Sequence, residues 1–318
     1  MMLHSEESPQ MDPAAITDVG CERTLNEDRY ASINSPSGTT WLVCDGMGGT
    51  AGGDLAAQLA IDAIRRDLEG QSARPPAVSI ENALMEANRV VVLRRQNQAF
   101  SQMGTTATAV QMLGAEIAIA NVGDSRAYLI RDGSIRQLTV DHTYVQDLVE
   151  RGELKEEEAL SHPQAHILTR CLGAEPGVEV DLTQYWITPS KHYSPSARGD
   201  LLLLCSDGLY SLVEDGEIAS MVTSRDPRDA CEQLVALAKE RGGFDNITIA
   251  IIPLDGELSF EPPAGYSSER MLQKLHSAST QVVSINIKAI FQSVMVIGIL
   301  SLIAVLTAGI AIALRMKV

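Results

Sequence analysis

The sequence predicts an α+β domain followed by one C-terminal transmembrane helix, and three observations lead to this prediction. Two stretches near the start of the chain, 54–68 and 79–93, repeat their apolar residues with the period of a helix. From residue 105 onward, short apolar stretches typical of β-strands dominate. Residues 289–314 carry no charge and are long enough, at about 1.5 Å per helical residue, to cross a bilayer.

The composition excludes several classes of protein. The 318 residues allow one large domain or two, and they carry a formal net charge of −16 with a pI near 4.8. A chain this acidic lacks the basic face that nucleic-acid binding needs, and it is not steered towards anionic lipid. The five cysteines are scattered without a C-x-x-C pair. We therefore expect neither a zinc site nor a disulfide framework, and we infer a reducing compartment.

The first part of the chain is polar and then becomes helical. Residues 1–12 contain no apolar stretch, so we expect a disordered N-terminus and no secretory signal there. Two short strands, 29–34 and 40–44, flank a Ser-Pro-Ser-Gly turn. Pro75-Pro76 then separates the two predicted helices.

Strands prevail in the second part, with two exceptions. Residues 144–160 are polar and helical with a thin apolar face, which is typical of a mobile appendage. A further helix begins at Asp226-Pro227 and ends at Gly242-Gly243. The expected strands are 105–113, 116–122, 127–130, 134–138, 201–205 and 247–254, with a hairpin turn at Asp132-Gly133.

Four aspartates lie at the margins of these apolar strands: Asp45, Asp124, Asp207 and Asp245. Strands of one sheet bring their ends together, so the carboxylates would repel one another unless a cation neutralised them. Oxygen ligands without His or Cys at metal spacing favour Mg²⁺ or Mn²⁺ over Zn²⁺. The alternative is that these are four independent turn residues.

An ordered series of motifs extends from residue 16 to 254 and resembles the metal-dependent Ser/Thr protein phosphatases of type 2C, the PPM family, in their bacterial form. The series is strong evidence for this resemblance because its members occur in this order. They are Thr17-Asp18-x-Gly-x-x-Arg23-x-x-Asn26-Glu27-Asp28, Asp45-Gly46-Met47-Gly48-Gly49, Gly104-Thr105-Thr106, Asn121-Val122-Gly123-Asp124-Ser125-Arg126, Asp141-His142, Leu168-Thr169-Arg170-x-Leu-Gly173, Ser206-Asp207-Gly208-Leu209 and Asp245-Asn246-Ile247-Thr248.

The resemblance implies a four-layer αββα sandwich, in which two antiparallel sheets are flanked by helices and a metal site lies at one edge. Residues 13–255 would form the catalytic domain, with a flap at about 144–166. The implied ligands of two Mn²⁺ or Mg²⁺ ions are Asp45, which would bridge both, the carbonyl of Gly46, and Asp207 and Asp245, with Glu27 and Asp28 beside them. Asp124 would support a third, weaker ion, and Arg23 would hold the substrate phosphate.

The implied activity is hydrolysis of phosphoserine and phosphothreonine in proteins by a water that bridges the metals and attacks phosphorus directly. Arg23 offers a planar fork that matches phosphate oxygens. Some family members carry His where Met47 stands, and Met47 cannot donate a proton. The proton for the leaving group would then come from metal-bound water.

The C-terminal part predicts attachment to a membrane. Residues 256–288 are interpreted as a linker, 289–314 as a single-pass helix and 315–318 as a tail. Because nothing upstream would export the catalytic domain, we expect it in the cytoplasm, acting on phosphoproteins and opposing a Ser/Thr kinase. Lys288 on one side and Arg315 and Lys317 on the other do not settle the orientation.

Two alternative functions stay open from the sequence. One is a catalytically silent, phosphoprotein-binding member of the same fold, although such proteins usually lose metal-binding aspartates and this chain has all of them. The other is a metal-dependent phosphodiesterase that acts on nucleotides. The excess of acidic residues makes this alternative weaker.

Overall fold

The computed structural model describes residues 11–48, 52–70, 72–189, 199–263, 266, 267 and 272. The chain divides into two units, Met1–Tyr266 and Ser267–Val318, and all the described strands lie in the first.

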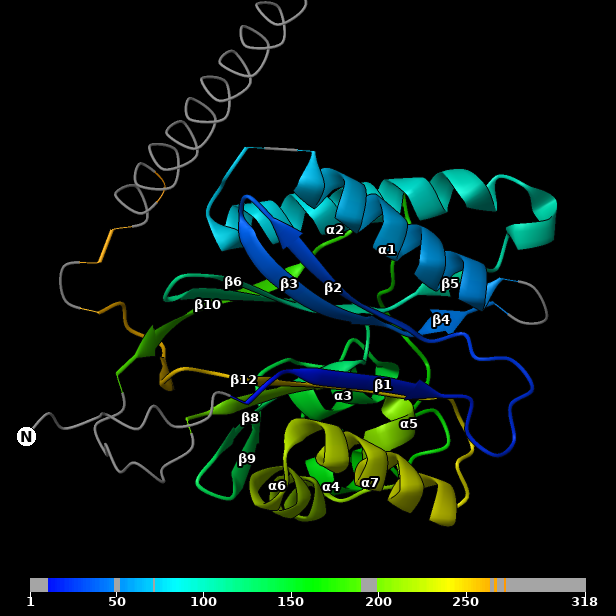
Figure 1. The fold of residues 1–318 in the computed structure, drawn as a ribbon. Helices are drawn as coiled ribbons and strands as arrows, with labels where there is room; N and C mark the ends of the chain where they lie inside the picture. Colours follow the sequence, from blue (N-terminus) through cyan, green and yellow to red (C-terminus); the bar gives the residue numbers. More distant parts are fainter. Residues whose placement is uncertain are drawn as a thin grey trace, which may run out of the picture. The chain divides into compact units, whose positions relative to one another are not determined.

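Two antiparallel sheets form the centre of this unit (Figure 1). In spatial order, the five-stranded sheet consists of β1 (Ala14–Asp18), β12 (Ile247–Pro253), β11 (Leu201–Cys205), β8 (Arg126–Arg131) and β9 (Ser134–Gln137). The six-stranded sheet consists of β13 (Glu257–Ser259), β10 (Asp181–Thr188), β7 (Glu116–Val122), β6 (Ala107–Leu113), β3 (Gly38–Cys44) and β2 (Arg29–Ser35). A small third ladder joins β4 (Gly46–Met47) to β5 (Gly104–Thr105).

Helices cover the outer face of each sheet. Helices α1 (Gly53–Glu69) and α2 (Pro76–Arg95) lie across the six-stranded sheet, and a 3-10 turn, η1 (Gln98–Phe100), follows α2 (Figure 1). The five-stranded sheet is covered by α5 (Asp207–Tyr210), α6 (Asp215–Ser224) and α7 (Pro227–Glu240). The predicted α+β architecture with two antiparallel sheets and flanking helices is confirmed.

Burial on both faces explains why the central strands are continuously apolar. In β11, Leu201, Leu203 and Cys205 face the α6–α7 layer, whereas Leu202 and Leu204 enter the core between the sheets. Side chains alternate across a strand, so a strand covered on both sides needs apolar residues at every position. This stretch was therefore recognisable in the sequence with its correct bounds.

Some partly buried elements were not predicted. Strand β1 pairs with β12 at the edge of its sheet, and all its residues are half-buried. Strand β10 pairs with β7 and mixes exposed and buried positions. Helix α6 was also missed, although a capping box of Glu214 and Glu217 marks its start.

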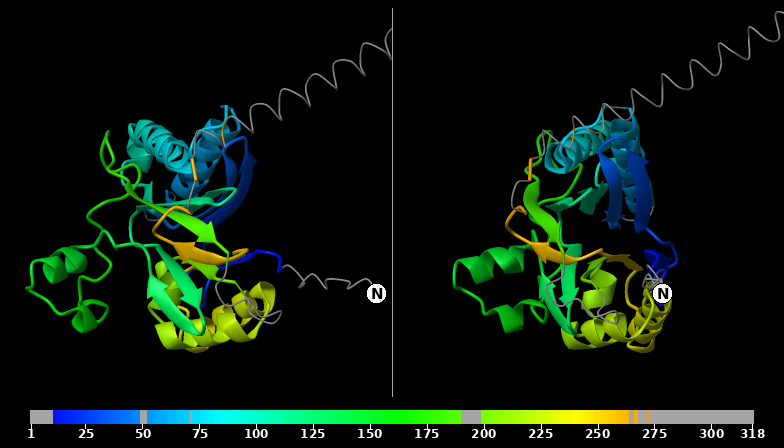
Figure 2. Two further views of the ribbon diagram at one scale, coloured as in Figure 1. Left: turned by 90° about the vertical axis from the view of Figure 1, so that its left-hand side faces the viewer. Right: turned by 60° about the vertical axis from the view of Figure 1, so that its left-hand side comes forward.

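The polar stretch 144–160 is not one helix. It forms two short helices, α3 (Tyr144–Glu150) and α4 (Glu156–Ala159), which stand apart from the sandwich in the two views of Figure 2. Thr143 accepts a hydrogen bond from the Gln146 N–H and so caps α3. The helices separate because α3 ends at Glu150, and Gly152, two residues farther on, has a left-handed φ of +71°.

The predicted linker begins too early. Strand β13 pairs with β10 beyond residue 255, and Leu258 is buried in the core between the sheets. Farther on, the Tyr266 hydroxyl donates to Glu116 at 2.7 Å. A three-residue strand is too short to show an alternating pattern, which is why it could not be predicted from the sequence.

The remaining terminal predictions fall outside the described residues. These are the disordered N-terminus as far as residue 10, most of the linker, the membrane helix 289–314 and the tail 315–318. Among the described residues, no helix is both long and apolar enough to span a bilayer.

Candidate functional site

Five aspartates gather where strand ends of the two sheets meet. Asp45 directly follows β3 and Asp28 directly precedes β2; these strands pair Cys44 with Arg29, so the two aspartates are neighbours. Asp124 follows β7, Asp207 follows β11, and Asp245 precedes β12. We call these residues, Asp28, Asp45, Asp124, Asp207 and Asp245, the acidic edge.

Strand pairing also brings the members from the second half of the chain together. Cys205 pairs with Ile249 of β12 on one side and with Arg126 of β8 on the other. Asp207, two residues beyond Cys205, therefore lies between the segments that carry Asp245 and Asp124. The four aspartates predicted at strand ends are thus assembled at one edge, and Asp28 joins them.

The electrostatic state of the acidic edge is unfavourable without a cation. Burial, followed by the charges of Asp28 and Asp207, raises the pKa of Asp45 well above its ordinary value. Part of Asp45 is open to solvent, but protein surrounds its carboxylate closely. Burial is therefore the main cause of its raised pKa. Burial also raises the pKa of Asp124 and Asp245, and it raises the pKa of Asp28 to about 7.

Two carboxylate oxygens at this edge lack a hydrogen-bond partner. Asp28 Oδ2 accepts a 2.7 Å hydrogen bond from Ser206, but Asp28 Oδ1 and Asp207 Oδ1 are buried without a partner. Such atoms are costly unless something satisfies them. Hard oxygen donors of this kind fit Mg²⁺ or Mn²⁺.

The side chains do not by themselves enclose an ion. In the described part of the chain, no three Asp, Glu, His or Cys side chains form a ready-made metal cage. Mg²⁺ ordinarily keeps several water ligands and takes one or two carboxylates, so a closed cage is not required. The carboxylate set therefore fits a partly hydrated cation.

Missing side chains keep space open beside Gly46. A Cβ on Gly53 would lie 2.6 Å from the Gly46 carbonyl oxygen and 2.4 Å from Glu27 Oε1. Glu27 accepts a hydrogen bond from the Gly53 N–H, the first amide of α1, at 3.1 Å. The predicted carbonyl donor and Glu27 are therefore brought together, and glycine at 53 is required for their approach.

Arg23 lies at the rim of the acidic edge. Its guanidinium donates to Asp245 Oδ2 at 2.7 Å, and about half of the side chain is exposed. The buried Asn246 fixes the loop that carries Arg23, because its amide donates to the carbonyls of Val19 and Leu25. Arg23 is thus positioned beside the carboxylates and remains open to an anionic ligand.

Sequence reasoning did not place His166 at this site. It lies at the end of the predicted flap, and its side chain is largely exposed. However, its Nδ1 lies 3.6 Å from Asp207 Oδ2, and the interaction with Asp207 raises the pKa of the imidazole. The available signal was its position just before the Leu168-Thr169-Arg170 motif.

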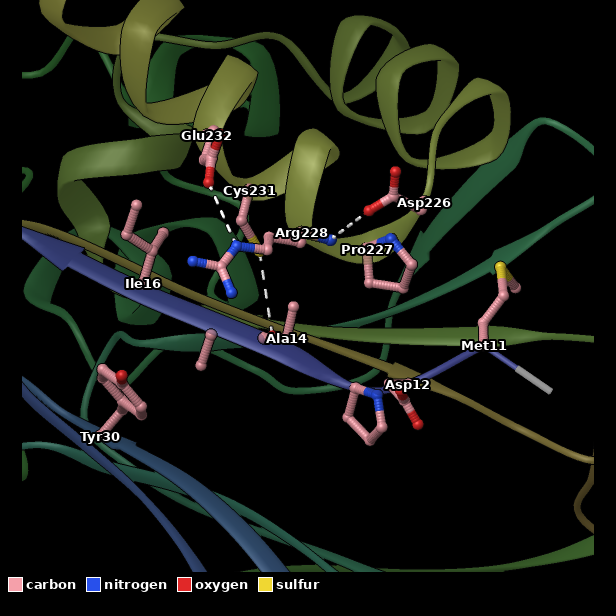
Figure 3. Close-up of a pocket in the computed structure, with 12 residues that line it drawn as sticks. Met11, Asp12, Ala14, Ile16, Tyr30, Asp226, Pro227, Arg228, Cys231 and Glu232 are labelled. Atoms are coloured by element: carbon pink, nitrogen blue, oxygen red, sulfur yellow. Dashed lines mark hydrogen bonds and ion pairs between the residues drawn. The ribbon is translucent and has the colours of Figure 1, made fainter. Parts of the chain in front are cut away.

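A separate groove of about 670 Å³ is lined by none of the acidic-edge residues. It lies between β1, Tyr30 of β2 and the start of α7 (Figure 3). Three of its charged side chains are engaged locally, since Arg228 pairs with Glu232 and Asp226 caps α7 (Figure 3). The groove therefore offers no chemistry comparable to that of the acidic edge.

Comparisons with known proteins agree on one family. Residues 22–243 match the family model described as protein phosphatase 2C. The serine/threonine phosphatase Stp of Listeria monocytogenes serotype 4b is 35% identical over 246 residues, which cover 75% of this chain and 94% of that protein.

Solved structures show the same likeness. The Mycobacterium tuberculosis serine/threonine phosphatase PstP/Ppp superposes with a TM-score of 0.67 at 34% identity, covering 77% of this chain and 99% of that one. A catalytic domain of PstP solved with two manganese ions gives a TM-score of 0.63 at 31% identity, covering 76% and 96%.

Proposed function

Because the chain belongs to the protein phosphatase 2C family and is a protein-serine/threonine phosphatase, we propose that the acidic edge is its active site. The observation that carries this proposal is the convergence of five aspartates, two of which have a buried oxygen without a partner. Such a set is unfavourable on its own and becomes favourable around divalent cations.

The proposed ligands of Mn²⁺ or Mg²⁺ are Asp45, the Gly46 carbonyl, Asp207 and Asp245. Glu27 and Asp28 lie beside them, and Asp124 serves a third, weaker ion. When bound, such ions lower the pKa of water and neutralise charge on a transferred phosphoryl group. The related PstP domain solved with two manganese ions supports this assignment.

Arg23 is proposed to bind the phosphate of the substrate. A phosphate monoester presents the guanidinium with oxygens of higher charge than those of Asp245, its present partner. The phosphoserine or phosphothreonine would then lie above the carboxylates, where water attacks phosphorus directly. Met47 follows Gly46 and has no proton to give, so the leaving alkoxide takes its proton from water.

We also propose that residues 289–314 tether this enzyme to a membrane with the catalytic domain in the cytoplasm. The support is the uncharged apolar run in the sequence. Tethering would bring it close to phosphoproteins at the membrane, including a Ser/Thr kinase and its substrates. Ending the chain at residue 288 should move the protein from the membrane pellet to the supernatant, and equal pelleting of both forms would refute the tether.

The reaction is tested with the full chain in detergent, a phosphothreonine peptide and Mn²⁺. Asp45→Ala and Asp207→Ala should each lower kcat by at least about 10²–10³-fold, the loss typical of removing electrostatic stabilisation of a transition state. Asp229→Asn serves as the matched control, because the Asp229 side chain on α7 is about half exposed. Full turnover under EDTA, or no turnover by the wild type, would refute the proposal.

A further inference from the structure

The turn that carries Asp124 has an unusual backbone. Gly123 has a φ of +109°, and a Cβ there would lie 2.5 Å from Thr106 Cγ2. The turn is therefore confined to glycine and closely packed. Since Asp124 comes next in the chain, the direction of its carboxylate depends on how this turn is held.

His142 holds the Gly123 side of the turn through two hydrogen bonds. The Gly123 N–H donates to His142 Nδ1 at 3.0 Å, and the His142 N–H donates to the Gly123 carbonyl at 3.0 Å. Because Nδ1 accepts, the ring proton belongs on Nε2, which lies 3.2 Å from Asp181 Oδ2. Burial lowers the pKa of His142, which keeps the ring neutral and Nδ1 able to accept.

Tyr210 holds the Asp124 side. Its hydroxyl donates to the Asp124 carbonyl at 3.0 Å. Tyr210 ends α5, the helix that begins with Asp207. One short helix thus carries a carboxylate of the acidic edge at its start and holds the backbone of another at its end.

The dipeptide Asp141-His142 connects both sides. Asp141 binds the guanidinium of Arg126 in bidentate fashion, at 2.7 and 3.0 Å. That guanidinium lies 3.6 Å from the centre of the Tyr210 ring. His142 therefore acts on the turn directly, whereas Asp141 acts on it through Arg126 and Tyr210.

We propose that His142 and Tyr210 are positioning residues that clamp the Gly123–Asp124 turn and thereby aim the Asp124 carboxylate into the active site. This inference rests on the proposed role of Asp124 in the reaction. It assigns a function to Asp141-His142, a motif of the sequence that the reaction itself does not use.

The test measures Mn²⁺ binding to the full chain in detergent by calorimetry, together with kcat and KM for a phosphothreonine peptide. Tyr210→Phe and His142→Leu should weaken the weakest Mn²⁺ binding event about tenfold, the change that one ordinary hydrogen bond supports. Both should lower kcat and leave KM unchanged, because Arg23 still holds the phosphate. The tighter Mn²⁺ events should stay as in the wild type, which also shows that each variant is folded.

Two controls separate positioning from general stability. His142→Asn places an amide oxygen near the position of Nδ1 and should restore Mn²⁺ binding towards the wild-type value. Tyr128→Phe removes a buried hydroxyl that accepts from the same Arg126 but does not contact Asp124, and it should bind Mn²⁺ as the wild type does. If His142→Leu does not fold, Tyr210→Phe decides alone.

Asp124→Asn separates a failure of the clamp from a failure of the proposed role of Asp124. If it removes the weakest Mn²⁺ event while Tyr210→Phe and His142→Leu bind normally, the clamp is refuted and the proposed function stands. If Asp124→Asn changes neither binding nor kcat, the role of Asp124 is refuted and the clamp with it.

Discussion

Buried aspartates occur in two different settings in this molecule. Outside the acidic edge, Asp200 accepts from Arg131 and from the Leu258 N–H, and Asp141 accepts from Arg126. At the acidic edge, Asp28 and Asp207 each keep a buried oxygen without a partner. The ion pairs that reach this edge, Arg23–Asp245 and His166–Asp207, involve exposed cationic side chains.

The difference separates carboxylates that serve the fold from those that we propose serve a ligand. A paired carboxylate carries its cation within the chain, so its geometry is complete when the chain has folded. The acidic edge is incomplete in that sense, and its charges favour folding only when cations arrive from solution. The two settings should therefore respond in opposite ways to mutation.

The largest effect is expected at a paired carboxylate. Arg126→Met leaves Asp141 without its ion-pair partner, and the lost pair should lower the free energy of unfolding by about 3–5 kcal/mol. Urea denaturation with and without Mn²⁺ measures this change. The loss should be similar in both conditions. A loss that vanished on adding Mn²⁺ would contradict the distinction between the two settings.

A smaller effect is expected at the acidic edge, where removing a carboxylate should stabilise the metal-free protein. The pKa of Asp28 is raised from 3.8 to about 7, so the folded, metal-free protein holds a proton that the unfolded chain releases. The resulting stabilisation is complete below about pH 3.8 and is lost as the pH rises through about 7. In EDTA, the free energy of unfolding should fall by about 1–3 kcal/mol from this group between pH 5 and 8.

Asp28→Asn isolates this contribution. Without the titrating carboxyl, the variant should lose most of that slope and be more stable than the wild type in EDTA at pH 8. Thermal denaturation across the pH range measures it, with Asp229→Asn as the exposed control. An unchanged slope in Asp28→Asn would show that the pKa of Asp28 is not raised in the metal-free protein.

The smallest effect is expected in the groove of Figure 3. Arg228 and Glu232 form an exposed i,i+4 pair on α7, so Arg228→Ala should change the free energy of unfolding by at most about 0.5 kcal/mol. Turnover of the phosphopeptide should stay at the wild-type rate. A clear loss of turnover would mean that the groove takes part in the reaction.

Much of the site was predictable because its residues follow a local rule. Asp45, Asp124, Asp207 and Asp245 each stand beside an apolar stretch, and strand ends converge whatever the details of packing. The same rule predicted the central strands, whose faces are both covered. It failed for β1, β10 and β13, where partial burial leaves a mixed pattern.

The remaining features depend on contacts between residues distant in the sequence. Ser206 donates to Asp28 across 178 positions, and Tyr210 reaches the Asp124 carbonyl across 86. No local pattern encodes such pairs, because each depends on how the two sheets stack. The approach of His166 to Asp207 likewise requires the α3–α4 region to turn back towards the sandwich.

The central claim is that the acidic edge exists to bind divalent cations, and calorimetric titration of Mn²⁺ into the full chain in detergent tests it most directly. The wild type should bind two Mn²⁺ ions tightly, the number found in the related PstP domain, in addition to the weaker third ion, and Asp45→Asn should lose the tight binding while it remains folded. Undetectable binding by the wild type, or equal binding by Asp45→Asn, would contradict the claim.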